Sequence, residues 1–217
     1  MMKNPISLAI VDDHRLFRTG ITSVIKEFKN IKIILEAENG KDLLEKLKIL
    51  QPDVILLDLK MPVMDGVEAT NIIRKKYPDC KIIIISMYDD YQLIYDMIQR
   101  GANGYLNKNA EIEEVINAIM TVYDKGYYLN GPALKAFNTT LTNSTNYRNT
   151  FSTPNLSSRE IEVVKLICDQ FTIKEIANKL NISPRTVDTY RENIFSKTNS
   201  KNIAGVVIYA MKNNIVQ

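Results

Sequence analysis

The sequence has few of the residues and segments on which several protein classes depend. It has two cysteines, Cys80 and Cys168, among 217 residues, which excludes a disulfide-stapled scaffold or a cysteine-rich zinc site and suits a reducing compartment. The longest apolar runs, such as residues 82–85, are far shorter than a membrane span, and residues 1–9 contain no secretory apolar core. No G-x-G-x-x-G motif follows the first predicted strand, which argues against a dinucleotide enzyme. We therefore expect a soluble cytoplasmic protein that does not act in a membrane.

The composition is that of a globular protein, with 45% hydrophobic and 24% charged residues. The formal net charge of +3 hides an asymmetry along the chain. Residues 1–125 contain 17 Lys and Arg against 19 Asp and Glu, whereas residues 126–217 contain 11 against 6. A mildly acidic first part and a basic second part favour two modules, the second facing a polyanion.

The first 125 residues alternate between apolar runs and segments of helical periodicity. Short β-branched runs, typical of buried strands, occur at residues 6–11, 31–35, 54–57 and 81–85, with a weaker one at 104–107. Segments with apolar residues at helical spacing lie between them, such as residues 17–28 and 112–119. This alternation predicts an α/β fold over residues 4–125, a doubly wound five-stranded parallel sheet of the flavodoxin-like kind.

The rest of the chain divides into a polar segment and a helical one. Residues 126–153 are interpreted as a linker, since residues 139–155 are dominated by Thr, Asn and Ser. Within that segment, residues 127–137 fit either a last helix or a hinge. Residues 154–217 predict a small all-α domain of four helices. Two of them have end signals: a capping box at Ser157–Glu160 opens the first helix, and the third has an N-cap at Ser183 with Pro184 next and a left-handed stop at Asn199.

Polar residues follow the predicted strands at their carboxyl ends, where open α/β sheets bind ligands. Asp12 and Asp13 follow the first strand, and Asp58, Ser86 and Lys108 follow the third, fourth and fifth. Clustered carboxylates need a cation, and their oxygens suit Mg²⁺. A carboxylate beside Mg²⁺ can attack phosphorus, while a lysine and a hydroxyl contact the phosphoryl oxygens. The set therefore predicts a site for an aspartyl phosphate.

These residues lie in strings that resemble the receiver domain of two-component response regulators. The strings are Val11-Asp12-Asp13-His14, residues 57–66 (LDLKMPVMDG), Ser86, and residues 104–108 (GYLNK). The resemblance implies that Asp58 is the phosphoacceptor and that Mg²⁺ is held by Asp13, Asp58 and the backbone carbonyl of Lys60, with Asp12 acting through water. It further implies that Ser86 and Lys108 contact the phosphoryl group and that Tyr105 turns inward on activation. Met87 departs from the small residue common after the switch serine.

The helical domain contains a predicted helix-turn-helix over residues 173–192, whose second helix continues to about residue 198. At 100° per residue, Val187, Ile194 and Thr198 share the inward face of its second helix. Arg185, Asp188, Thr189, Glu192, Asn193 and Ser196 face outward and would enter the major groove of DNA. The residues predicted to contact DNA are Lys174, Lys179, Arg185, Thr186, Asp188, Thr189, Arg191, Glu192, Lys197 and Lys201. The alternative is a helical interaction module with a solvated charged face.

The domain resembles the LuxR-type helix-turn-helix of NarL/FixJ regulators. The matching strings are residues 156–160 (LSSRE), 174–177 (KEIA) and 182–187 (ISPRTV), whereas Asp188 and Glu192 stand where basic residues are frequent. The two resemblances imply a DNA-binding transcriptional regulator that a sensor histidine kinase phosphorylates on Asp58. They imply that the phosphorylated protein forms a homodimer on a two-fold double-stranded DNA site.

Two alternatives remain open on the sequence. One is an aspartyl-phosphate phosphohydrolase, which needs a general acid two residues after the nucleophile, where this chain has Lys60. The other is a constitutive DNA-binding protein with a silent receiver. We expect no enzymatic activity beyond slow self-dephosphorylation.

Overall fold

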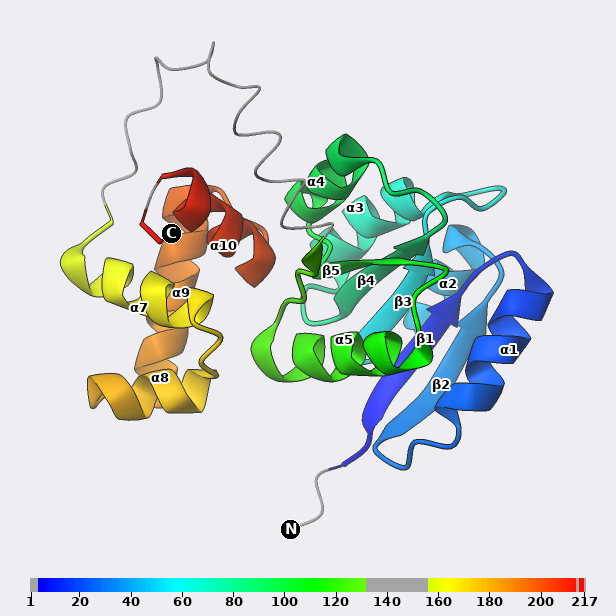
Figure 1. Cartoon of the computed structure of the whole chain (residues 1–217), viewed down its shortest axis with the longest axis horizontal. Coiled ribbons are helices and arrows are strands. Elements are labelled where there is room, and N and C mark those ends of the chain that lie inside the picture. Colours follow the sequence, from blue (N-terminus) through cyan, green and yellow to red (C-terminus); the bar gives the residue numbers. More distant parts are fainter. Residues whose placement is uncertain (1–3, 132–155, 214, 217) are drawn as a thin grey trace.

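The computed structural model describes residues 4–131, 156–213 and 215–216. In the first range, one parallel sheet contains β1 (Ile6–Val11), β2 (Ile31–Ala37), β3 (Val54–Asp58), β4 (Lys81–Ser86) and β5 (Gly104–Asn107). The strand order is β2-β1-β3-β4-β5, so the predicted doubly wound sheet is confirmed (Figure 1). The chain winds in opposite directions from β1, and the switch point lies at the carboxyl ends of β1 and β3.

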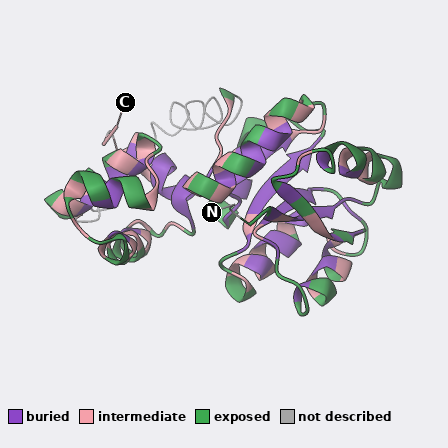
Figure 2. Cartoon of the chain, turned by 90° about the horizontal axis from the view of Figure 1, so that it is seen from below, coloured by how far each residue is buried: buried purple, intermediate pink, exposed green. Residues whose placement is uncertain are grey.

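Helices cover both faces of the sheet (Figure 1). One face carries α1 (Arg15–Ile25) and α5 (Ile112–Lys125), and the other carries α2 (Gly40–Leu47), α3 (Gly66–Lys76) and α4 (Tyr91–Arg100). Alternate residues of each strand therefore enter two different cores: Leu8 and Ile10 pack with α1 and α5, and Ala9 and Val11 pack with the opposite helices. Burial on both faces explains why the strands are nearly continuous apolar runs (Figure 2).

The chain beyond α5 stays on the edge of the sheet. Gly126 has a φ of 88°, a left-handed conformation that ends the helix and redirects the chain. Tyr128 then forms a parallel bridge with Gly104 of β5, and the Tyr128 N–H donates to the Asn103 carbonyl at 2.8 Å. The predicted boundary at residue 125 is the end of α5, but the first part of the predicted linker packs as an added edge. Residues 132–153 of that linker lie outside the described residues.

The second domain contains α7 (Ser158–Cys168), α8 (Ile173–Leu180), α9 (Pro184–Thr198) and α10 (Ile203–Lys212). The predicted end signals are confirmed: Ser157 and Glu160 form a capping box, Ser183 accepts from the Thr186 N–H, and Asn199 is left-handed at φ 51°. Val187 and Ile194 are fully buried, as the helical periodicity predicts. No helix in the described ranges has the length and apolar character needed to span a bilayer.

The two domains contact each other at the amino end of the sheet. The Asn202 side-chain amide donates to the carbonyl oxygens of Gly101 and Ala102, at 2.7 and 2.8 Å, just before β5. Asn202 also caps α10, because its Oδ1 accepts from the Gly205 N–H at 2.9 Å. The Tyr127 hydroxyl donates to the Ile167 carbonyl of α7 at 3.2 Å. The loop before β5 and the segment after α5 thus contact the second domain, as does α4, which packs on α10.

Candidate functional site

The predicted carboxylates meet at the carboxyl end of the sheet. β1 and β3 pair through Val11 and Leu57, so Asp12 and Asp58, one residue further, end side by side. Both are buried, at 1% and 3% exposure, while the Asp13 side chain is 30% exposed. One ligand atom each from Asp12, Asp13, His14 and Asp58 lies within 4.8 Å of all the others. These residues come together because the carboxyl ends of β1 and β3 are neighbours, as the sequence predicts.

Lys108 lies between the two buried carboxylates. Its Nζ is 2.7 Å from Asp12 Oδ2 and 3.0 Å from Asp58 Oδ2, and its side chain is 8% exposed. Burial by itself would lower the pKa of Lys108, but hydrogen bonds to Asp12 and Asp58 outweigh it and raise the pKa. The lysine is therefore charged at neutral pH, and it offsets the repulsion between the two carboxylates.

Asp58 is held so that its carboxylate faces this cluster. Its Oδ1 accepts from the Leu59 N–H at 2.8 Å. Burial raises the pKa of Asp58, and the hydrogen bond from Lys108 opposes that shift. The start of α3 packs directly on the same main chain, because a Cβ at Gly66 would lie 2.3 Å from the Asp58 carbonyl oxygen. Only glycine fits this close approach.

The other predicted residues lie around the carboxylates. Ser86 is buried at the end of β4, one residue past Ile85, which pairs with Asp58. Tyr105 is 2% exposed, and its hydroxyl donates to the Tyr88 carbonyl at 2.7 Å. Burial raises the pKa of Tyr105 to about 12. The ring of this tyrosine therefore lies inward in this structure.

Lys60 extends over the exposed side of the site. Its Nζ lies 4.5 Å from the centre of the Tyr88 ring, in a cation–π contact. Met87, between Ser86 and Tyr88 in the chain, is 61% exposed and points away from the core. This contact joins the loop after β3 to the loop after β4.

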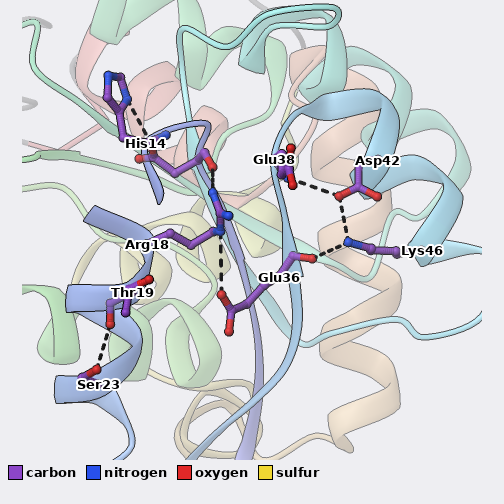
Figure 3. A network of polar contacts seen from close by, with 9 residues as sticks. His14, Arg18, Thr19, Ser23, Glu36, Glu38, Asp42 and Lys46 are labelled. Atoms are coloured by element: carbon purple, nitrogen blue, oxygen red, sulfur yellow. Dashed lines mark hydrogen bonds and ion pairs between the residues drawn. The ribbon is translucent and has the colours of Figure 1, made fainter. Parts of the chain in front are cut away.

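Two residues of α1 support the site, and no local sequence signal identifies them. Arg18 donates from Nη1 to the Asp12 carbonyl, and its Nε lies 3.7 Å from Glu36 Oε2 of β2. Figure 3 shows Arg18 placed between the loop after β1 and this edge strand. The Phe17 ring lies 5.0 Å from Lys108 Nζ. Arg18 reaches Asp12 across the first turn of α1, and Phe17 meets a lysine that is distant in the chain. Only the folded structure shows these contacts.

The donor set fits a hard divalent cation. The carboxylates of Asp12, Asp13 and Asp58 supply oxygen ligands, and the partner of the buried Asp12 Oδ2 among the described residues is the Lys108 ammonium, at 2.7 Å. Receiver domains generally bind Mg²⁺ at an acidic pocket of this kind. When bound there, Mg²⁺ reduces the repulsion between carboxylates and phosphoryl oxygens.

The second domain presents a mixed-charge surface around α9. Lys174 and Lys179 of α8 and Lys201 after α9 are exposed, and the Lys179 Nζ lies over the Phe171 ring at 4.2 Å. Arg185, Thr189 and Glu192 of α9 are exposed, and Thr186 is half-buried beside its Ser183 cap. The contact with the first domain leaves these residues uncovered.

Two of the predicted DNA-contacting cations have partners within the domain. Lys197 forms an ion pair with the buried Glu160 at 2.8 Å, and so ties α9 to the capping box of α7. Arg191 donates from Nη1 to Asp188 Oδ1 at 2.8 Å. Both cations thus form ion pairs within the domain, which the residue pattern did not predict.

Comparison with known families agrees with both halves of this structure. Residues 8–120 match the response regulator receiver domain, and residues 154–210 match the bacterial regulatory proteins of the luxR family. The receiver-domain structure of NarL from Mycobacterium tuberculosis is 30% identical, with a TM-score of 0.54, and covers 56% of this chain and 98% of its own. The structure of response regulator ChrA, 26% identical with a TM-score of 0.52, covers 99% of this chain and 100% of its own.

Curated relatives match along nearly the whole chain. Response regulator GacA of Pseudomonas aeruginosa is 32% identical, over 97% of this chain and 98% of its own length. Oxygen regulatory protein NreC of Staphylococcus carnosus is 34% identical, over 97% and 99%. The chain therefore belongs to the two-component response regulators that join a receiver domain to a luxR-type DNA-binding domain.

Proposed function

We propose that Asp58 accepts a phosphoryl group from a phosphohistidine of a sensor histidine kinase. An Asp58 carboxylate oxygen attacks phosphorus, the bond from phosphorus to the histidine nitrogen breaks, and the imidazole leaves as the neutral base after taking up a proton. The observation that carries the proposal is Lys108 Nζ between Asp12 and Asp58, at 2.7 and 3.0 Å. That ammonium is placed to balance charge on an incoming phosphoryl oxygen.

Asp12, Asp13, Asp58 and the Lys60 carbonyl would hold Mg²⁺ during this transfer. The buried Ser86 hydroxyl would donate a hydrogen bond to a phosphoryl oxygen. The added charge, close to −2, would change the balance of conformations around Ser86 and the inward Tyr105. We expect no turnover of small phosphate esters beyond slow self-dephosphorylation, because Lys60 stands where a phosphohydrolase needs its general acid.

The second domain would bind double-stranded DNA through α9, and the lysines of this domain would contact phosphates. One helix of 15 residues buries too little surface for tight binding to one half-site. A homodimer of the phosphorylated protein on a two-fold site would supply the second half. A protein of this kind works in the cytoplasm.

The test compares the wild-type chain with Asp58→Asn and Asp79→Asn. Asp79 is exposed at the opposite end of the sheet and provides a matched loss of one carboxylate. With acetyl phosphate and Mg²⁺, we expect wild type and Asp79→Asn to gain the mass of one phosphoryl group and to bind DNA more tightly. Asp58→Asn should do neither. An equal response from Asp58→Asn would refute the proposal and favour a constitutive DNA-binding protein. Rapid multiple turnover of phosphate esters would favour the phosphohydrolase.

A further inference from the structure

The exposed face of α9 carries one straight stripe of four side chains. Val187 and Ile194 are fully buried, and they define the side of the helix that packs on the domain core. At 100° per residue, the residues opposite them are those spaced i, i+4, i+7 and i+11 from Arg185. They are Arg185, Thr189, Glu192 and Ser196, and all four are exposed. We call this set the reading stripe.

The reading stripe has one acidic residue, Glu192, and its carboxylate is not used in a contact within the described part of the chain. Among the described residues, Glu192 has no hydrogen-bond or ion-pair partner. Asp188 lies on the flank instead, and Arg191 holds its carboxylate at 2.8 Å. The guanidinium of Arg185, at the amino end of the stripe, likewise has no partner within the described part of the chain. Thr189 donates its hydroxyl to the Arg185 carbonyl at 3.1 Å, so it can only accept.

A lone carboxylate restricts the base that it can contact. It accepts hydrogen bonds and donates none, and the phosphates repel it, so it has no sequence-independent role in DNA binding. In the major groove, cytosine presents the N4 amino donor, whereas guanine presents two acceptors. Adenine places an N7 acceptor beside its N6 donor, which suits the amide of Gln or Asn and repels a second acceptor. Cytosine is therefore the base that a carboxylate on the stripe selects.

The spacing of the two charged residues sets the distance between the bases. Seven residues of helix rise about 10.5 Å, which corresponds to about three base pairs when the helix follows the groove. Arginine at the other end of that interval pairs with guanine through two hydrogen bonds.

We propose that Glu192 reads a cytosine in each half-site, and that Arg185 reads a guanine about three base pairs away. The proposal rests on the proposed function of α9 in DNA binding, and it adds the base identity. Because the stripe holds equal numbers of cations and anions, discrimination between sequences depends on these two contacts more than on net charge.

The experiment selects bound sequences from a random double-stranded DNA library with the full chain, phosphorylated by acetyl phosphate in Mg²⁺. The variants are Glu192→Gln, Glu192→Ala and Glu162→Gln. Glu162 is exposed on α7, outside the helix-turn-helix, so its substitution removes the same charge elsewhere in the domain. Circular dichroism verifies that each variant keeps its helices.

The wild type should enrich a cytosine at one position of each half-site by about 5- to 150-fold over the other bases, the range of ~1–3 kcal/mol for a specific base contact. Glu192→Gln should change that position to adenine and leave the guanine unchanged. Glu192→Ala should abolish the preference at that position alone, and Glu162→Gln should select the wild-type sequence. An unchanged cytosine with both Glu192 variants overturns the proposal. Failure of the wild type to retain any DNA overturns the proposed function itself.

Discussion

Asn202 provides the sharpest test of how the two domains are joined. Its amide nitrogen donates to Gly101 and Ala102 of the receiver, whereas its oxygen accepts from Gly205 within α10. Asn202→Asp therefore removes the donor to the receiver and keeps the acceptor that caps the helix. Asp and Asn are equally good N-caps, and a negative charge suits a helix start. The substitution is thus directed at the interface and not at the fold of the DNA-binding domain.

The magnitude follows from the contacts. Two buried hydrogen bonds at ~0.5–1.5 kcal/mol each give ~1–3 kcal/mol, which shifts the docked-to-separated equilibrium about 5- to 150-fold. The new carboxylate also faces the two carbonyl oxygens that Asn202 now contacts, at 2.7 and 2.8 Å, and repels both. We therefore expect an effect at the upper end of this range.

Nuclear magnetic relaxation of backbone ¹⁵N measures the result, since domains that separate tumble with shorter and unequal correlation times. Wild type should show one correlation time for both domains, and Asn202→Asp two. Asn178→Asp, an exposed position on α8, is the matched control and should behave as wild type. A single common correlation time in Asn202→Asp would refute the role of these hydrogen bonds in docking.

Three further substitutions test local features of the structure. Gly66→Ala should lower the free energy of unfolding, measured with urea, by ~1–3 kcal/mol. The alanine Cβ would meet main-chain atoms of Asp58 and Leu59 at 2.3 and 2.9 Å. Val63→Gly should raise the free energy of unfolding by ~0.5–1 kcal/mol and so raise the urea midpoint, since Val63 is a β-branched residue held at φ 69°. Burial opposes ionisation of Glu160, but hydrogen bonds from Lys197 and Ser157 lower its pKa below the ordinary 4.5. Wild type should therefore be ~1 kcal/mol more stable than Glu160→Gln at pH 7, and should lose this advantage as the pH falls through the lowered pKa.

Each of these outcomes has a clear opposite. A wild-type urea midpoint for Gly66→Ala would mean that α3 does not approach the Asp58 main chain so closely. A lower midpoint for Val63→Gly would show that the left-handed valine is not strained. If the stabilities of wild type and Glu160→Gln changed in parallel from pH 7 to pH 3, the pKa of Glu160 would be the same in the folded and unfolded states.

Features set by neighbours in the chain were predictable from the sequence. The helix ends of the second domain depend on side chains that cap their own helix, such as Ser157 and Ser183, and the predicted ends agree with the structure. The acidic site was predictable for a related reason. Parallel strands place their carboxyl ends at one edge, so polar residues that follow successive strands must converge.

Features that depend on the packing of distant segments were not predictable. Asn202 resembles an ordinary N-cap in sequence, and its second role exists only because the loop before β5 lies against it. Phe17 resembles a core residue, yet its ring faces Lys108. Lys197 was predicted to contact phosphate, but a buried glutamate 37 residues earlier pairs with it. In each case the partner is chosen by tertiary structure, about which local periodicity says nothing.

The pairing of Tyr128 with β5 has a consequence for how the receiver avoids association. β5 is an outer strand, and an outer strand offers unpaired amide and carbonyl groups to any other extended chain. The segment after α5 occupies part of this row, because Tyr128 pairs with Gly104 and its N–H donates to the Asn103 carbonyl. A receiver cut at the end of α5 would lose this cover and present β5 to its neighbours. The same few residues that lead toward the DNA-binding domain therefore also protect the sheet from edge-to-edge aggregation.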